Sequence, residues 1–521
     1  MQMRPIQRRA LMSTAAAAAL LSATRPVSAQ SQPKRGGDMV MAQQAQPPSL
    51  DAMTTFAQAS RNITMHIFET LYTRGETGSV ITSLASGCDI SPDFKTYTFH
   101  LRKGVKFHNG KEMTGADVKA SLLRYAKIGG SAQLLSPVAQ IDVPDPYIVV
   151  FHLSSAVPAF LDLISTPRAP MVIIPAEQAG KDVNKIDLIG TGPFQFVEYQ
   201  PDSHVKLRRF DAYSPDTNFQ GPDGFGGKKT PYFDTVTIRF MPEAGARAAA
   251  LQTGEAQALE QIAVTDANRL KSNTSIRLYE MMPWAFQVFF LNANEAPTNN
   301  LKFRQAVRAA LGNEEILAIA EDGLYRMAPA WQHPGTQYYS AVTGNDVYNV
   351  NNVDLAKSLL KEAGYKGEPF TLVTDSSFSN DSDGSVIASQ QLQAAGINVK
   401  LVTVDWPTSI AMRSKPTGWS MFPIFIGIEP WEGPYSTTTF FTGASNWQQH
   451  IDPELEADAA KLNTAPVLAD RQAAFAAFQQ RVIDQVYAIK LGDLGIYQAT
   501  HSNVANYKPF RIPRMWDVWF T

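Results

Sequence analysis

Residues 92–121, PDFKTYTFHLRKGVKFHNGKEMTGADVKAS, carry the most informative pattern in the chain. Apolar and polar side chains alternate over Thr96–Arg102, and this period of two is typical of a half-buried β-strand. Lys103-Gly104 predicts a turn, after which the alternation resumes at Val105 and Phe107. The first half of the stretch therefore predicts two strands joined as a hairpin.

The second half of the stretch predicts a turn followed by a helix. Asn109-Gly110 favours a tight turn because both residues tolerate positive φ. Thr114 stands three residues before Asp117, a variant of the capping box that begins helices. We expect the helix to continue through Val118 and Leu122.

The whole stretch resembles the signature of the peptide- and nickel-binding family of solute-binding proteins that serve ABC importers. Further segments match the family in the same order: Phe68-Glu69-Thr70-Leu71-Tyr72, Gly190-Thr191-Gly192-Pro193-Phe194 and Val353–Gly364. The resemblance covers nearly all of the chain after residue 29. It implies a protein that captures a small solute, peptide-type by family, in an interlobe cleft and delivers it to the membrane permease of an ABC importer.

The length and composition fit that class of protein. A chain of 521 residues is too long for one hydrophobic core, so several lobes are expected. It is 44% hydrophobic and 18% charged, which is a normal globular balance. The net charge of −2 argues against nucleic acid or an anionic membrane surface as the main partner. We expect a monomer.

The resemblance implies an α/β fold with two lobes, like other periplasmic binding proteins, and an additional smaller inserted α/β lobe. In the family, the Gly190–Phe194 motif is where the chain returns from the inserted lobe to the first one. The expected division is residues 1–29 for an export signal peptide, 30–73, 188–278 and 500–521 for the first lobe, 74–187 for the inserted lobe and 279–499 for the second large lobe.

Several elements can be predicted within these lobes. Arg61–Leu71 reads as a helix, and another helix is expected between Asp354 as N-cap and Gly364 as C-cap. A strand–helix–strand alternation, which implies parallel pairing, is predicted over Phe370–Val373, Ser385–Ala395 and Val399–Val404.

Residues 1–29 resemble an export signal. Arg8-Arg9 precedes the uncharged run Ala10–Thr24, and Val27-Ser28-Ala29 resembles a cleavage site. Arg8-Arg9 followed by Leu11-Met12 resembles the twin-arginine type of signal, and Sec export fits as well. The uncharged run is too short to span a bilayer core of about 30 Å. We therefore expect a protein of the periplasm.

Motifs for catalysis or metal binding are not found in the sequence. There is no Gly-Xaa-Ser-Xaa-Gly elbow, no His-Glu-Xaa-Xaa-His and no phosphate loop. Ser379–Gln390 resembles a calcium loop but lacks its first and last acids, so a loop that caps the next helix is expected instead. Cys88, the only cysteine, is expected to be a small buried residue. We expect no enzymatic activity and no cofactor.

Three candidate ligand contacts precede the second large lobe. Arg168, in Thr166-Pro167-Arg168-Ala169-Pro170, matches an arginine that the nickel-binding branch uses to hold a carboxylate of its metal chelator. A guanidinium suits that role because it binds carboxylates through two parallel hydrogen bonds. A solvated loop arginine is an equal alternative. Phe56 and Arg61 match family contact positions more loosely, and structural roles compete for both.

The second large lobe offers further candidates. Phe378 falls where dipeptide binders carry a tyrosine, and Ser376 where they carry an arginine for the ligand carboxylate. Peptide binders hold an aspartate for the α-amine within the segment that here spans Trp419–Tyr435, which contains no aspartate. Glu429 in that segment is a further candidate. Trp406, Trp419 and Trp431 could form an aromatic wall, and packing in the core is the alternative role for each of them.

These patterns favour a periplasmic solute-binding protein and leave three alternatives open. Within the class, a binder of an anionic small molecule or of a metal–chelate complex is the alternative to a peptide binder. Outside it, a secreted hydrolase on the same fold would need a nucleophile and base in the cleft, for which the sequence has no motif. A ligand-free chaperone or receptor module would have a filled cleft.

Overall fold

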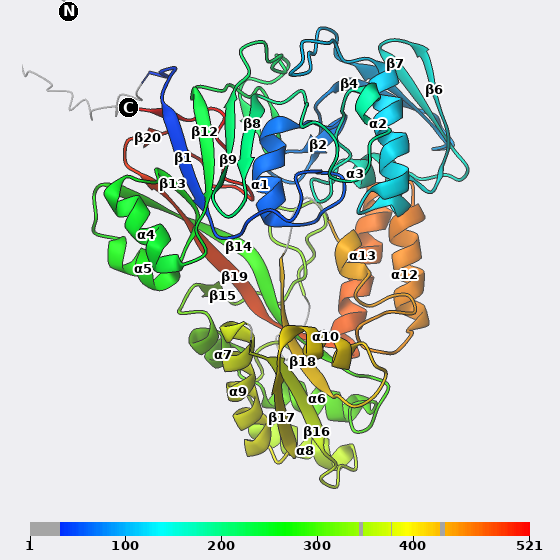
Figure 1. The fold of residues 1–521 in the computed structure, drawn as a ribbon. Helices are drawn as coiled ribbons and strands as arrows, with labels where there is room; N and C mark the ends of the chain where they lie inside the picture. Colours follow the sequence, from blue (N-terminus) through cyan, green and yellow to red (C-terminus); the bar gives the residue numbers. More distant parts are fainter. Residues whose placement is uncertain (1–31, 343–346, 377, 428–432) are drawn as a thin grey trace, which may run out of the picture.

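The computed structural model describes residues 32–342, 347–376, 378–427 and 433–521. It is an α/β protein built around an 11-stranded mixed sheet with the order β17-β16-β18-β14-β19-β13-β1-β12-β9-β8, in which β15 pairs with β19. Two long antiparallel strands, β14 (Ile276–Leu291) and β19 (Ala488–His501), run diagonally from the upper to the lower half of the molecule (Figure 1). They connect the two large parts of the fold.

The upper part of the large sheet gathers strands from the first half of the chain. β1 pairs in parallel with β12 and with β13, while β9 is antiparallel to both β12 and β8. These strands are β1 (Asp38–Gln43), β8 (Phe194–Gln200), β9 (His204–Arg209), β12 (Thr235–Phe240) and β13 (Ala258–Ile262). The helices of this part are α1 (Gln58–Ile67), α4 (Ala244–Thr253) and α5 (Val264–Leu270).

The segment between β1 and β8 carries a second, four-stranded antiparallel sheet with the order β4-β5-β7-β6. Its strands are β4 (Ala85–Ile90), β5 (Thr96–Leu101), β6 (Val138–Asp145) and β7 (Ile148–Leu153). Beside it lie α2 (Gly115–Ile128) and the short α3 (Phe160–Ile164) (Figure 1). Two-stranded sheets complete the upper part: β2 (Tyr72–Arg74) with β3 (Val80–Thr82), β10 (Pro222–Asp223) with β11 (Gly226–Gly227), and β20 (Val504–Ala505) with β21 (Trp519–Phe520).

The lower part contains the predicted parallel β–α–β unit. β16 (Phe370–Asp375) pairs in parallel with β17 (Val399–Val404), and the helix between them is α9 (Ser379–Ala394). The other strands are β18 (Met421–Gly427) and β15 (Tyr325–Arg326). The remaining helices are α6 (Leu301–Ala310), α7 (Asn313–Ala320), α8 (Val353–Glu362), α10 (Trp406–Arg413), α11 (Tyr435–Thr438), α12 (Pro453–Thr464) and α13 (Leu468–Asp484).

The predicted hairpin at residues 96–107 is wrong in its second strand. β5 forms as expected, but it pairs with β4 and β7. Val105 and Phe107 are buried in the core but do not belong to a strand. In this segment, Lys106 forms an isolated β-bridge with Glu112. The alternation at these residues therefore reflected burial of every second side chain rather than strand pairing.

Four other local predictions need correction. The helix expected over Arg61–Leu71 is α1, which begins and ends earlier, at Gln58 and Ile67. The N-cap of α8 is Asn352, whose side chain accepts a hydrogen bond from the Leu355 amide, so Asp354 lies in the first turn. The expected start of a helix at Ser385 is also late, because α9 already begins at Ser379. Cys88 is only half-buried.

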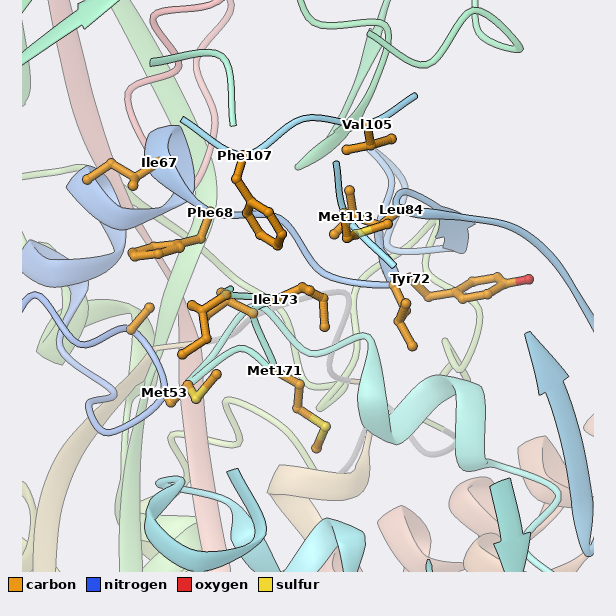
Figure 2. Close-up of a cluster of buried hydrophobic side chains, with 14 of the residues drawn as sticks. Met53, Ile67, Phe68, Tyr72, Leu84, Val105, Phe107, Met113, Met171 and Ile173 are labelled. Carbon is orange, nitrogen blue, oxygen red and sulfur yellow. The ribbon is translucent and has the colours of Figure 1, made fainter. Parts of the chain in front are cut away.

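A single hydrophobic core joins the four-stranded sheet to the upper part of the large sheet. It combines Met39 of β1 with Tyr97 and Phe99 of β5. Figure 2 shows the middle of this core, where Phe68 and Phe107 point towards Ile173. The four-stranded sheet is therefore packed firmly against the upper part of the molecule.

The two family motifs meet beneath this core. The Nζ of Lys229 lies 3.1 Å from Oε1 of Glu69, and both side chains are buried. Thr191 donates from its hydroxyl to Oε2 of the same carboxylate at 3.0 Å. A Cβ on Gly190 would lie 2.0 Å from the carbonyl oxygen of Ile67, so no larger residue fits there. Close backbone contact explains the glycine, and a compensated buried charge explains the glutamate.

Candidate ligand site

A cavity of about 350 Å³ lies between the four-stranded part and the lower part of the molecule. The upper side of its lining comes from residues before α1, from β2, from the turn after α2, and from α3 with the loop that follows. The lower side comes from α11 and the residue after it. The described lining residues are Phe56, Arg74, Ser131, Gln133, Leu134, Asp162, Leu163, Thr166, Arg168, Tyr435 and Thr439. This size suits a small solute rather than a long peptide.

The structure brings two predicted residues, Arg168 and Phe56, together at this cavity. The guanidinium carbon of Arg168 lies 5.7 Å from the centroid of the Phe56 ring, which is 47% exposed. The loop that carries Arg168 is held in place, because Tyr125 donates its hydroxyl to the carbonyl of Ala169 at 2.6 Å. Ala169 itself has φ +48, in the left-handed region that only a constrained loop imposes on alanine. The guanidinium is therefore supplied by a fixed loop.

The cavity also holds an acid that is already paired. Asp162 accepts a hydrogen bond from Nη1 of Arg74 at 3.1 Å through Oδ1, and its backbone carbonyl accepts one from Nη2 at 2.5 Å. Arg74 is almost fully buried. Because a buried arginine neutralises this carboxylate, Asp162 is a poor partner for the ammonium group of a ligand.

On the opposite wall, Tyr435 belongs to a chain of polar side chains. Its hydroxyl lies 3.0 Å from the hydroxyl of Tyr338, and Tyr338 accepts a hydrogen bond from Nε of Arg471 at 3.3 Å. The two tyrosine rings pack edge to face with centroids 5.9 Å apart. Tyr435 therefore lines the cavity with a polar side chain whose hydroxyl is held in place by Tyr338.

The other predicted contacts lie elsewhere. Arg61 is 7% exposed on α1 and donates a hydrogen bond to Gln58. Phe378 packs edge to face against Phe425, with ring centroids 5.2 Å apart. The exposed Ser376 donates to the carbonyl of Val404 at 3.3 Å.

Trp419, one of the three residues of the predicted aromatic wall, does not line the cavity. This side chain is 1% exposed and donates its indole N–H to the carbonyl of Lys415 at 2.8 Å, so the structure favours the core-packing alternative. Trp406 is the first residue of α10, and its side chain lies outside the described part of the chain, as do Glu429 and Trp431 altogether.

Ser379–Gln390, which resembles a calcium loop in sequence, lies within helix α9. The prediction of a loop that caps the next helix is therefore wrong. Asp381, in the first turn of α9, is 0% exposed and accepts a hydrogen bond from Nε2 of Gln287 at 2.5 Å. Burial raises the pKa of the Asp381 carboxyl to about 7; the neighbouring Asp375 carboxylate also raises it, whereas Gln287 and Arg413 lower it. Within the described residues, Oδ2 of Asp381 and Oε1 of Gln287 have no hydrogen-bond partner.

Sequence reasoning missed most of the cavity lining. Arg74 and Asp162 contact each other across 88 positions, and neither stands in a motif. Tyr435 is the last residue of the segment in which peptide binders carry an aspartate, but nothing in that segment indicates a role for its hydroxyl. The spacing between Tyr338 and Arg471 likewise has no periodic signal, because it arises only when the loop before α8 packs on α13.

Comparison with known proteins gives one family and one fold. The profile of the bacterial extracellular solute-binding proteins, family 5 Middle, matches residues 79–448. A probable peptide ABC transporter periplasmic-binding protein of Sinorhizobium fredii is 27% identical over 492 residues, 90% of this chain and 91% of that protein. A glutathione-binding protein of Pectobacterium atrosepticum is 27% identical over 498 residues, 92% of each chain.

Among solved structures, the NikA protein of Brucella suis in complex with Fe(III)-EDTA superposes with a TM-score of 0.81 at 20% identity, covering 93% of this chain and all of the other. That similarity concerns the fold. The relatives named above are binding proteins rather than enzymes. Among the helices of the described residues, none has the length and apolar character needed to cross a membrane.

Proposed function

Because the chain belongs to the bacterial extracellular solute-binding proteins of family 5, we propose that it captures a small anionic or amine-blocked solute in the cavity beside Arg168. In this proposal the chain is exported to the periplasm and delivers the solute, as a monomer, to the permease of an ABC importer. Residues 74–187 form the inserted lobe that carries Arg168, and residues 279–499 form the lobe that closes on it.

The observation that carries the proposal is the position of Arg168 on the cavity. A guanidinium fixed by its loop and placed on the face of Phe56 can hold a carboxylate through two hydrogen bonds. Because the cavity is lined from both sides, a bound solute contacts both lobes and thereby favours the closed arrangement. A cavity of about 350 Å³ limits that solute to a small molecule.

The charges around the cavity favour an anion over a free peptide. Of the described residues that line it, Asp162 alone carries a carboxylate, and Arg74 pairs with it. An α-ammonium buried there without its own carboxylate would cost several kcal/mol. The relatives named for peptides and glutathione handle solutes that carry carboxylates, which agrees with a site for that group.

Calorimetry with a matched set of small probes tests this proposal. N-acetyl-dialanine has a carboxylate and no amine, its C-terminal amide has neither charge, and dialanine has both. We expect N-acetyl-dialanine to bind more tightly than its C-terminal amide and more tightly than dialanine. Fe(III)-EDTA, added as a fourth probe, separates a chelate binder from a binder of organic acids.

Replacement of Arg168 by Ala should weaken N-acetyl-dialanine binding by about 1.5–3 kcal/mol, the range for a hydrogen bond to a charged group. Arg239→Ala is the matched control, since Arg239 pairs with Glu255 on an exposed surface and does not line the cavity. Tight binding of dialanine that survives Arg168→Ala would contradict the proposal. Recovery of a hydrolysed probe would instead indicate an enzyme.

A further inference from the structure

Three side chains from separate segments form a polar chain that ends at the cavity. Arg471 lies on α13, Tyr338 in the loop before α8, and Tyr435 at the start of α11. The hydrogen bonds run from Nε of Arg471 to the hydroxyl of Tyr338 at 3.3 Å, and from there to the hydroxyl of Tyr435 at 3.0 Å. Only Tyr435 lines the cavity.

The chemistry of these groups sets the direction of the hydrogen bonds. A guanidinium can only donate, so the oxygen of Tyr338 accepts from Arg471. Tyr338 is 3% exposed, and a buried hydroxyl hydrogen needs an acceptor. Among the described residues, the hydroxyl of Tyr435 is the acceptor within reach. Tyr338 therefore donates to Tyr435, which leaves the hydrogen of Tyr435 to be donated elsewhere.

Arg471, the first of these three side chains, is also held in place. Nη1 of Arg471 donates to the carbonyl oxygens of Ala465 and Pro466, at 3.1 and 3.2 Å. The Tyr338 ring packs closely on the backbone at Gly433, where a Cβ would lie 3.2 Å from the ring. Burial raises the pKa of the Tyr435 hydroxyl, and Tyr338 adds to the shift, so Tyr435 keeps its proton. Across the cavity, Asp162 is the acidic group that faces Tyr435 and Arg471.

We propose that Arg471 and Tyr338 are positioning residues that make the Tyr435 hydroxyl an obligate hydrogen-bond donor to the bound solute. The cavity then offers a donor on each wall, Arg168 on one side and Tyr435 on the other. Such a pair selects a solute whose carboxylate accepts from both donors and disfavours one that presents the N–H groups of an amide to Tyr435. The inference rests on the proposed function, because it assigns the specificity of the same site.

The test measures selectivity rather than affinity alone. The quantity is the ratio of the Kd of N-acetyl-dialanine amide to the Kd of N-acetyl-dialanine, determined by calorimetry. Tyr435→Phe should lower this ratio by about tenfold or more, because a donor to a charged acceptor is lost. Tyr338→Phe should lower it by about three- to tenfold, because the Tyr435 hydroxyl can then accept from the amide as well.

Tyr339→Phe is the control, since the neighbouring Tyr339 is an exposed tyrosine that does not line the cavity. Thermal unfolding of each variant shows whether the fold is kept, and a merely structural role would change both Kd values equally and leave the ratio unchanged. An unchanged ratio in Tyr435→Phe and Tyr338→Phe overturns the inference while the proposed function stands. If the wild-type protein binds neither acid nor amide, the proposed function fails, and this inference fails with it.

Discussion

Replacement of Asp381 by Asn should remove about 4 kcal/mol of the pH dependence of stability between about pH 4 and about pH 7. The Asp381 carboxyl is buried, with a pKa raised to about 7. While it is ionised, Oδ2 of Asp381 and Oε1 of Gln287 are both acceptors, and neither has a donor among the described residues. A proton on Oδ2 supplies one donor, and the amide of an asparagine would supply the same donor permanently.

The sign and the size follow from the shift in pKa. Below about pH 4 the carboxyl is protonated in the folded and the unfolded chain, so pH has no effect through this group. Between the ordinary value of 3.8 and about 7, only the folded chain keeps the proton, and the free energy of unfolding falls as the pH rises. About three pH units at 1.36 kcal/mol each give a loss of about 4 kcal/mol, and the loss stops above about pH 7.

Urea-induced unfolding of both proteins at about pH 4 and about pH 8 measures this difference. The wild type should lose about 4 kcal/mol more than Asp381→Asn between the two conditions. Asp383→Asn, an exposed position on the same helix, is the control and should behave like the wild type. Glu321, whose pKa burial also raises to about 7, contributes a slope of the same sign that both proteins retain. An equal loss in the wild type and in Asp381→Asn would show that the folded protein does not hold a proton on Asp381 over this pH range.

Three further substitutions test the fold and one site assignment. Gly190→Ala should destabilise the protein by about 2 kcal/mol or more in urea unfolding, because its Cβ meets a backbone carbonyl, whereas Gly180→Ala, with open space around it, should be tolerated. Glu69→Gln should cost about 3 kcal/mol, because it leaves a buried lysine without its anion, while Glu255→Gln in an exposed ion pair should cost less than about 1 kcal/mol. Trp419→Phe should lower the melting temperature and leave probe affinity unchanged; the reverse result would make Trp419 a ligand contact.

The sequence predicted the parts of the fold that local chemistry determines. The alternation at Thr96–Leu101 marked β5, and the Gly190–Phe194 motif marked a close backbone contact that the structure contains. The pairing of β5 with β7 could not be predicted, because it joins residues as far apart in the sequence as Thr96 and His152. The start of α9 was missed because serine, asparagine and aspartate usually favour turns, whereas here Ser379, Asn380 and Asp381 form the first turn of the helix.

Some residues of the candidate site could be predicted from the sequence and others could not. Arg168 could be named because a short motif surrounds it, and Phe56 because it loosely matches a family contact position; the structure places both on the cavity. Trp419 was named on its residue type alone, which cannot distinguish a cavity wall from a core. Asp162 and Tyr435 became visible only in the folded chain, because their roles depend on Arg74 and Tyr338, which lie far away in the sequence.

Native mass spectrometry of the protein purified from its own periplasm can identify the solute, because a molecule that co-purifies is identified by its mass. We expect one small molecule per chain that carries a carboxylate or another anion and no free α-amine, and that is lost from the Arg168→Ala variant. A free di- or tripeptide retained equally by the wild type and by Arg168→Ala would contradict this expectation.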